Sequence, residues 1–132
     1  MRIGYSISTP EIAELLNRIR QPFNVNSLAL IAAEAALQDD AHLQSSVTLN
    51  QSGMQQLMTA FTTMKLSWIP SAGNFICVDC GRDAAPVYET LLREGVIVRP
   101  VANYGLPQHL RITIGTEAEN QLFTQTLAKV LR

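Results

Sequence analysis

The chain has 132 residues, of which 47% are hydrophobic and 16% are charged, and its formal net charge is −1 at pH 7. This length suits one domain that buries about two-thirds of its unfolded surface around a single core. The near-neutral charge argues against a nucleic-acid partner, and the absence of a run of about 20 apolar residues argues against a membrane span. The amino terminus lacks a signal-peptide pattern, so we expect a cytoplasmic protein that recognises a small molecule or a protein.

The first 38 residues predict a short strand followed by two helices. Residues 2–5 resemble the end of a strand, and Thr9 with Pro10 forms a typical helix start. The apolar residues that follow recur with a helical period and predict one buried face: Ile12, Leu15, Leu16 and Ile19. Pro22 disfavours helix at the preceding residue. The segment 27–37 is apolar nearly all round, which predicts a helix surrounded by other parts of a protein.

A long helix and two short strands are expected next. The helical pattern runs over residues 39–64 and carries Gly53 in its interior, which weakens the prediction of an unbroken helix. Strands are predicted at 66–69 and 74–79, with residues 70–73 as the turn between them.

The last part of the chain alternates helix and strand once more. A helix over 85–94 is expected to end at Gly95, and strands are expected over 96–99 and 109–114. Thr116 and Glu119 have the spacing of a capping box that opens a last helix. The predicted fold class is α+β, with a short β-sheet covered by helices.

Two cysteines, Cys77 and Cys80, form an isolated Cys-x-x-Cys motif. A zinc site would need two further ligands, and the two histidines, His42 and His109, lack ligand spacing. Cys77 also falls within a predicted strand. We therefore expect two buried or half-buried free thiols and no metal site.

Two arginines on neighbouring predicted strands are the candidate anion-binding residues. Alternation along 109–114 places one set of side chains on one face of the sheet and a second set on the other: Leu110, Ile112 and Ile114 against His109, Arg111 and Thr113. From the pattern alone, a solvated surface position is the favoured interpretation for both Arg99 and Arg111. Brought together, two guanidinium groups would form a fork for a substrate anion.

Five motifs resemble the histidinol-phosphate aminotransferase family in the order in which that family carries them. They are RIGY at 2–5, RIRQPFNVNSLA at 18–29, PSAGNFI at 70–76, GVIVRP at 95–100 and LRITIGT at 110–116. Together the motifs are spread along the chain from residue 2 to residue 116. The Asn24-Val25-Asn26 part of the second motif is first of all a helix entry and cap.

The resemblance implies a pyridoxal phosphate enzyme of fold type I. In that family the coenzyme forms a Schiff base with a lysine, and an arginine about eight residues later binds its phosphate; Arg2 matches this arginine. The lysine would then precede Met1, so this chain would be a C-terminal fragment. Residues 1–38 would be the end of the large coenzyme-binding domain with an interdomain helix, and residues 39–132 the small C-terminal domain, in a homodimeric parent enzyme.

The resemblance also assigns substrate-binding roles. Arg111 matches the arginine that binds the anionic end of both substrates, Arg99 its companion for phosphate recognition, and Asn74 a residue facing the site. The implied reaction is transamination between histidinol phosphate and 2-oxoglutarate in histidine biosynthesis. Because the Schiff-base lysine is missing, we expect the isolated chain to have no catalytic residue and no activity.

Two other functions remain open at this point. One is another aminotransferase or decarboxylase of the same superfamily, acting on an aromatic amino acid or a phosphorylated amino alcohol. The other is a non-catalytic binding module that uses the same surface without a coenzyme.

Overall fold

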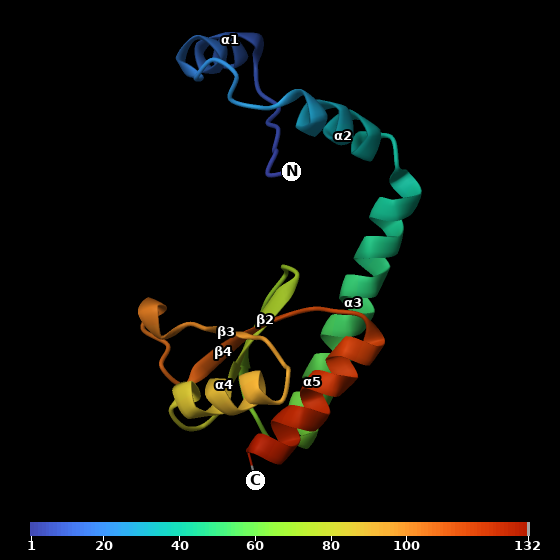
Figure 1. Cartoon of the computed structure of the whole chain (residues 1–132). Helices are drawn as coiled ribbons and strands as arrows, with labels where there is room; N and C mark the ends of the chain where they lie inside the picture. Colours follow the sequence, from blue (N-terminus) through green and yellow to red (C-terminus); the bar gives the residue numbers. More distant parts are fainter. Residues whose placement is uncertain (132) are drawn as a thin grey trace. The chain divides into compact units, whose positions relative to one another are not determined.

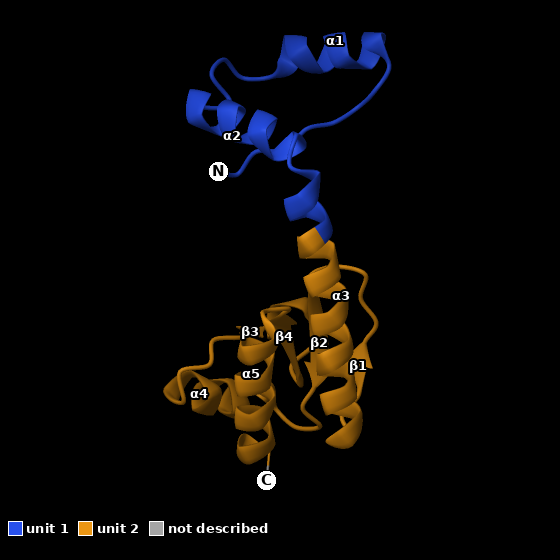
Figure 2. Ribbon diagram, turned by 90° about the vertical axis from the view of Figure 1, so that its right-hand side faces the viewer, with its two compact units in different colours: residues 1–44 blue, residues 45–132 orange. Residues whose placement is uncertain are grey.

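The computed structural model describes residues 1–131 and divides the chain into two compact units, Met1–Gln44 and Ser45–Arg132 (Figure 2). The sequence placed a domain boundary after residue 38. The assignment of the first 38 residues to a large coenzyme-binding domain stays a prediction.

The first unit holds two complete helices, α1 (Pro10–Ile19) and α2 (Ser27–Leu37). Pro10 is at the first turn of α1, as predicted, although the Thr9 side chain makes no capping hydrogen bond. Asn26 caps α2, since its side chain accepts a hydrogen bond from the Ala29 backbone at 2.9 Å. The predicted strand at 2–5 is wrong: residues 1–9 have no regular secondary structure, and no described strand pairs with them.

Burial in the first unit also differs from the prediction. No residue of α1 is buried, and Ala29 is the one buried residue of α2. The larger apolar side chains of both helices are exposed: Ile12, Leu15, Leu16, Ile19, Leu28, Leu30, Ile31 and Leu37. The amphipathic pattern shows that a face is suited to burial, and this unit is too small to provide the apolar neighbours that would bury it.

The second unit is built on a four-stranded antiparallel sheet with the order β1-β2-β4-β3. The strands are β1 (Trp68–Ile69), β2 (Phe75–Asp79), β3 (Arg99–Pro100) and β4 (His109–Thr113). The strand predicted at 96–99 is displaced towards the C-terminus, and β3 begins at Arg99. The Val96 backbone donates a hydrogen bond to the Leu91 carbonyl and the Val96 side chain is buried, so the segment 96–98 does not pair with β4.

Helices cover one face of this sheet (Figure 1). They are α3 (Asp40–Thr63), which begins in the first unit, α4 (Ala84–Arg93) and α5 (Glu117–Val130), with a short 3-10 turn η1 (Ala102–Tyr104) after β3. Alternate residues of β2 and β4 join the helices in one hydrophobic core. Its fully buried members are Leu57, Phe61, Ile76, Val78, Leu91, Leu110 and Leu127.

Local signals place the helix ends where the sequence predicted them. The Thr116 and Glu119 capping box that opens α5 is formed in both directions. Gly95 has a φ of 80° after α4 and closes that helix by donating to the Leu92 carbonyl. No helix within residues 1–131 is long and apolar enough to cross a membrane.

Candidate functional site

The sheet face opposite the helices carries a row of four directly paired residues. Ile69 on β1 lies opposite Cys77 on β2, Cys77 lies opposite Arg111 on β4, and Arg111 lies opposite Arg99 on β3. Their neighbours on β2 and β4, Ile76, Val78, Leu110 and Ile112, point into the core. The row therefore lies on the side of the sheet that the helices leave uncovered.

Arg99 and Arg111 are brought together as the sequence predicted. They are cross-strand partners, with Arg99 exposed on the edge strand and Arg111 half-buried on the inner one. Like charges in directly opposite positions destabilise a sheet unless an anion lies near them. Within residues 1–131 neither guanidinium has an ion-pair partner.

Phe75 also contacts Arg111. The Arg111 Cζ atom lies 4.9 Å from the centroid of the Phe75 ring. The Nε atom of Arg111 is buried and has no hydrogen-bond partner among the described residues. Sequence reasoning missed this contact because alternation along β2 puts Phe75 on the outer face but does not reveal its register with β4.

Asn74, the third predicted substrate residue, precedes β2 directly. Its backbone carbonyl accepts a hydrogen bond from Ile114 at 2.9 Å, which extends the β2–β4 ladder by one step. The residue is exposed. The backbone of Asn74 is thus fixed at the end of the β2–β4 ladder, and contact of its side chain with a substrate stays a prediction.

The two thiols behave as the sequence predicted. Cys77 is half-buried, Cys80 is buried, and both are free. Burial raises the pKa of both, while Arg111 acts against the rise at Cys77. No group of three or more metal-ligating side chains was found among residues 1–131.

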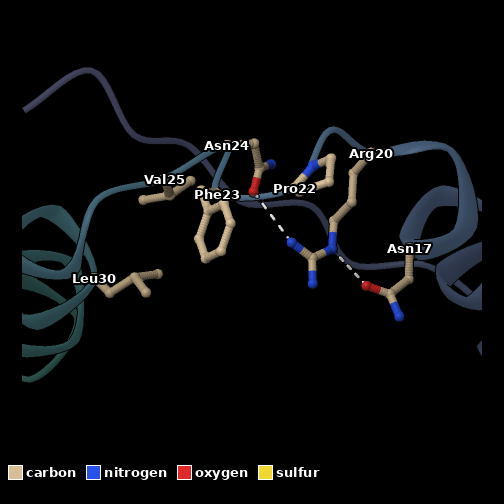
Figure 3. Close-up of a pocket in the computed structure, with 7 residues that line it drawn as sticks. All are labelled: Asn17, Arg20, Pro22, Phe23, Asn24, Val25 and Leu30. Atoms are coloured by element: carbon tan, nitrogen blue, oxygen red, sulfur yellow. Dashed lines mark hydrogen bonds between the residues drawn. The ribbon is translucent and has the colours of Figure 1, made fainter.

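A hollow of about 770 Å³ lies within the first unit, at the turn between α1 and α2 (Figure 3). Arg20 crosses it and donates hydrogen bonds to the side-chain oxygens of Asn17 and Asn24. Phe23 next to them is almost fully exposed. These hydrogen bonds connect the last turn of α1 to the loop before α2, and none of the predicted site residues lines this hollow.

Comparisons with known proteins show which family the chain belongs to. The family model described as aminotransferase class I and II matches residues 1–127. The chain belongs to the class I and II aminotransferase family. Histidinol-phosphate aminotransferase 2 of Pseudomonas fluorescens (strain Pf0-1) is 66% identical over 131 residues, a match covering 99% of this chain and 35% of that protein.

Two further relatives cover the same share of an aminotransferase. Histidinol-phosphate aminotransferase 2 of Pseudomonas aeruginosa is 61% identical over 99% of this chain and 36% of its own length. The solved histidinol-phosphate aminotransferase from Sinorhizobium meliloti, in complex with pyridoxal-5'-phosphate, has a TM-score of 0.80 and 31% identity, covering 96% of this chain and 35% of that one. The chain spans about a third of the length of the aminotransferases that it matches.

The described residues of this aminotransferase chain do not fit the coenzyme by themselves. Arg2, the predicted phosphate ligand, is exposed and belongs to the first unit. Lys65 is exposed in a left-handed turn just after α3, rather than on the helix, and Lys129 is exposed in the last turn of α5. Neither lysine is in the arginine row, so neither is placed to hold pyridoxal phosphate there.

Proposed function

We propose that the chain forms the anion-binding part of a histidinol-phosphate aminotransferase. That enzyme transfers the amino group of histidinol phosphate to 2-oxoglutarate, giving imidazole-acetol phosphate and glutamate. The observation that carries the proposal is the pairing of Arg99 with Arg111 on the sheet face that the helices leave uncovered, where neither forms an ion pair within residues 1–131. The names of the relatives that are 53–66% identical over nearly the whole chain support the choice of substrate.

Arg111 is proposed to bind the anionic end of both substrates. A planar guanidinium presents five donors and can grip either a phosphate or a carboxylate through two parallel hydrogen bonds. Arg99, directly opposite, adds a second positive charge that favours the phosphate, which carries more charge than one carboxylate. Asn74 is proposed to face the same site from the start of β2.

The coenzyme part of the proposal concerns the whole enzyme. Pyridoxal phosphate would supply the electron sink for transamination, with Arg2 as a ligand of its phosphate. For the isolated 132-residue chain we propose no activity, because its two lysines lie away from the arginine row. A homodimeric parent and a cytoplasmic location stay predictions.

The two other functions have less support. The family model spans residues 1–127, which favours a part of an aminotransferase over an independent binding module. Curated relatives that are 58–66% identical carry the histidinol-phosphate aminotransferase name, which favours that substrate over an aromatic amino acid or another amino alcohol.

The proposal can be tested by grafting this chain into an enzyme. Residues 1–131 replace the matching segment of the Pseudomonas fluorescens enzyme, and steady-state kinetics are measured with histidinol phosphate and with glutamate. We expect an active graft in which Arg111→Ala lowers kcat/KM at least about 10- to 100-fold for both substrates, since it removes a charge-assisted bidentate contact. Arg99→Ala should lower kcat/KM for histidinol phosphate more than for glutamate.

Arg93→Ala is the matched control, because Arg93 is exposed at the end of α4 and outside the row. Its kinetics should equal those of the unaltered graft. An active graft in which Arg111→Ala behaves like Arg93→Ala would contradict the proposed site. Equal losses with glutamate for Arg99→Ala and Arg111→Ala would contradict the division of roles.

A further inference from the structure

The position of Phe75 is fixed from two sides. As the first residue of β2 it pairs with Thr113, which places its ring diagonally next to Arg111 on the uncovered face. The turn before it contributes as well, because the Cβ position of Gly73 is 3.5 Å from the ring. Gly73 is in turn held by Asn50 of α3, which donates a hydrogen bond to the Gly73 carbonyl at 3.3 Å. The ring therefore has a defined place although it is 36% exposed.

The other neighbours of Arg111 do not orient its guanidinium. Cys77 on one side is an uncharged thiol, because burial raises its pKa. Arg99 on the other side carries the same charge and repels it. Among residues 1–131 no carboxylate forms an ion pair with Arg111, and its Nε has no hydrogen-bond acceptor.

The Phe75 ring is the described group that lies against the Arg111 guanidinium. Its π face attracts a cation, and Cζ lies 4.9 Å from the centroid, well inside the range of that interaction. A ring also takes none of the guanidinium's hydrogen-bond donors, whereas a carboxylate would occupy two. Nε is the nitrogen buried without a partner, which leaves the terminal nitrogens as the donors for a ligand.

We propose that Phe75 is a positioning residue that holds the Arg111 guanidinium on the sheet face with its terminal nitrogens free for the substrate anion. This inference rests on the proposed function, since the anion is the one assigned to Arg111 there. The ring takes the place that a carboxylate has in many arginine sites, without neutralising the charge that attracts the ligand.

The test uses the 132-residue chain and inorganic phosphate as the probe. Nuclear magnetic resonance follows the Arg111 Nε–H signal, which a ring below the guanidinium shifts upfield, and the change of that signal during a phosphate titration. Phe75→Leu removes the ring but keeps an apolar side chain, and Phe75→Tyr keeps the ring. Phe23→Leu is the control, because Phe23 is 99% exposed in the other unit.

We expect Phe75→Leu to abolish the upfield shift and to weaken phosphate binding about fivefold, while Phe75→Tyr and Phe23→Leu behave like the unaltered chain. If Phe75→Leu does not fold, Phe75→Met replaces it. Unchanged phosphate affinity in a folded ring-free variant would overturn the role of Phe75 and leave the arginine site standing. A chain whose Arg111 signal does not respond to phosphate at all would overturn both the proposed function and this inference.

Discussion

Arg111 and Arg99 show how much of the site can be predicted at the scale of single residues. Alternation along β4 correctly separates the buried Leu110 and Ile112 from Arg111 between them. It does not reveal that Arg99 is the directly opposite residue, because strand register depends on pairing across the sheet. The contact with Phe75 could not be predicted for the same reason.

Cys80 gives a prediction that depends on pH. Burial, assisted by the nearby Asp79 carboxylate, raises the pKa of this thiol from its ordinary value of 9.0 to about 11. The folded state therefore disfavours the thiolate. The protonated Cys80 thiol contributes fully to the free energy of unfolding below pH 9, and this contribution is lost as the pH rises towards 11. Urea unfolding should show that the free energy of unfolding falls between pH 9 and pH 11. The fall should be about 1–2 kcal/mol smaller in Cys80→Ala than in the unaltered chain.

Cys77→Ala is the comparison for that experiment, since the Cys77 thiol is only half-buried and Arg111 opposes its shift. It should change the pH dependence less than Cys80→Ala does. Identical slopes between pH 9 and 11 for Cys80→Ala and the unaltered chain would show that the buried thiol does not resist ionisation.

At the scale of elements, Gly53 made an unbroken helix doubtful in the sequence, and the structure shows that α3 is continuous and that this glycine permits close packing. It lies buried within α3, where the end of β4 and the start of α5 approach most closely. A Cβ at this position would lie 2.5 Å from Ile114 Cγ2 and 2.9 Å from Asn120 Nδ2. Asn120 is itself buried and hydrogen-bonded to both backbone groups of Gly115, so it has little freedom to move.

We therefore expect Gly53→Ala to destabilise the second unit by about 1–3 kcal/mol, although alanine is the better helix former by roughly 1 kcal/mol. Ser52→Ala, at the exposed neighbouring position of the same helix, is the control and should change stability by less than about 0.5 kcal/mol. Urea unfolding of both variants provides the measurement. A Gly53→Ala variant as stable as Ser52→Ala would mean that the packing of α3 against α5 is looser than the structure shows.

Helix boundaries were predicted better than strand boundaries, and the cause is physical. The α4 and α5 ends depend on residues close in sequence, such as Gly95 and the Thr116 capping box. The extent of β3 depends instead on whether the segment 96–98 pairs with β4. Burial of the Val96 side chain prevents this pairing. Non-local competition of this kind leaves no local sequence signal.

At the scale of the whole molecule, the two units differ in how they meet the predictions. The second unit has the predicted α+β fold with its own core. The first has helices at the predicted places but exposes the apolar faces that the sequence expected to be buried. Hydrophobic periodicity predicts that an apolar helix face packs against another apolar surface. The pattern does not say which part of the protein provides that surface.

Arg99 and Arg111 are proposed to bind the anionic group of the substrate. A crystal structure of the active graft with bound histidinol phosphate tests this proposal most directly. We predict phosphate oxygens within hydrogen-bond distance of the Arg111 terminal nitrogens, with Arg99 beside them and the Phe75 ring still beneath the guanidinium. A phosphate group bound elsewhere, with both arginines facing solvent, would contradict the claim.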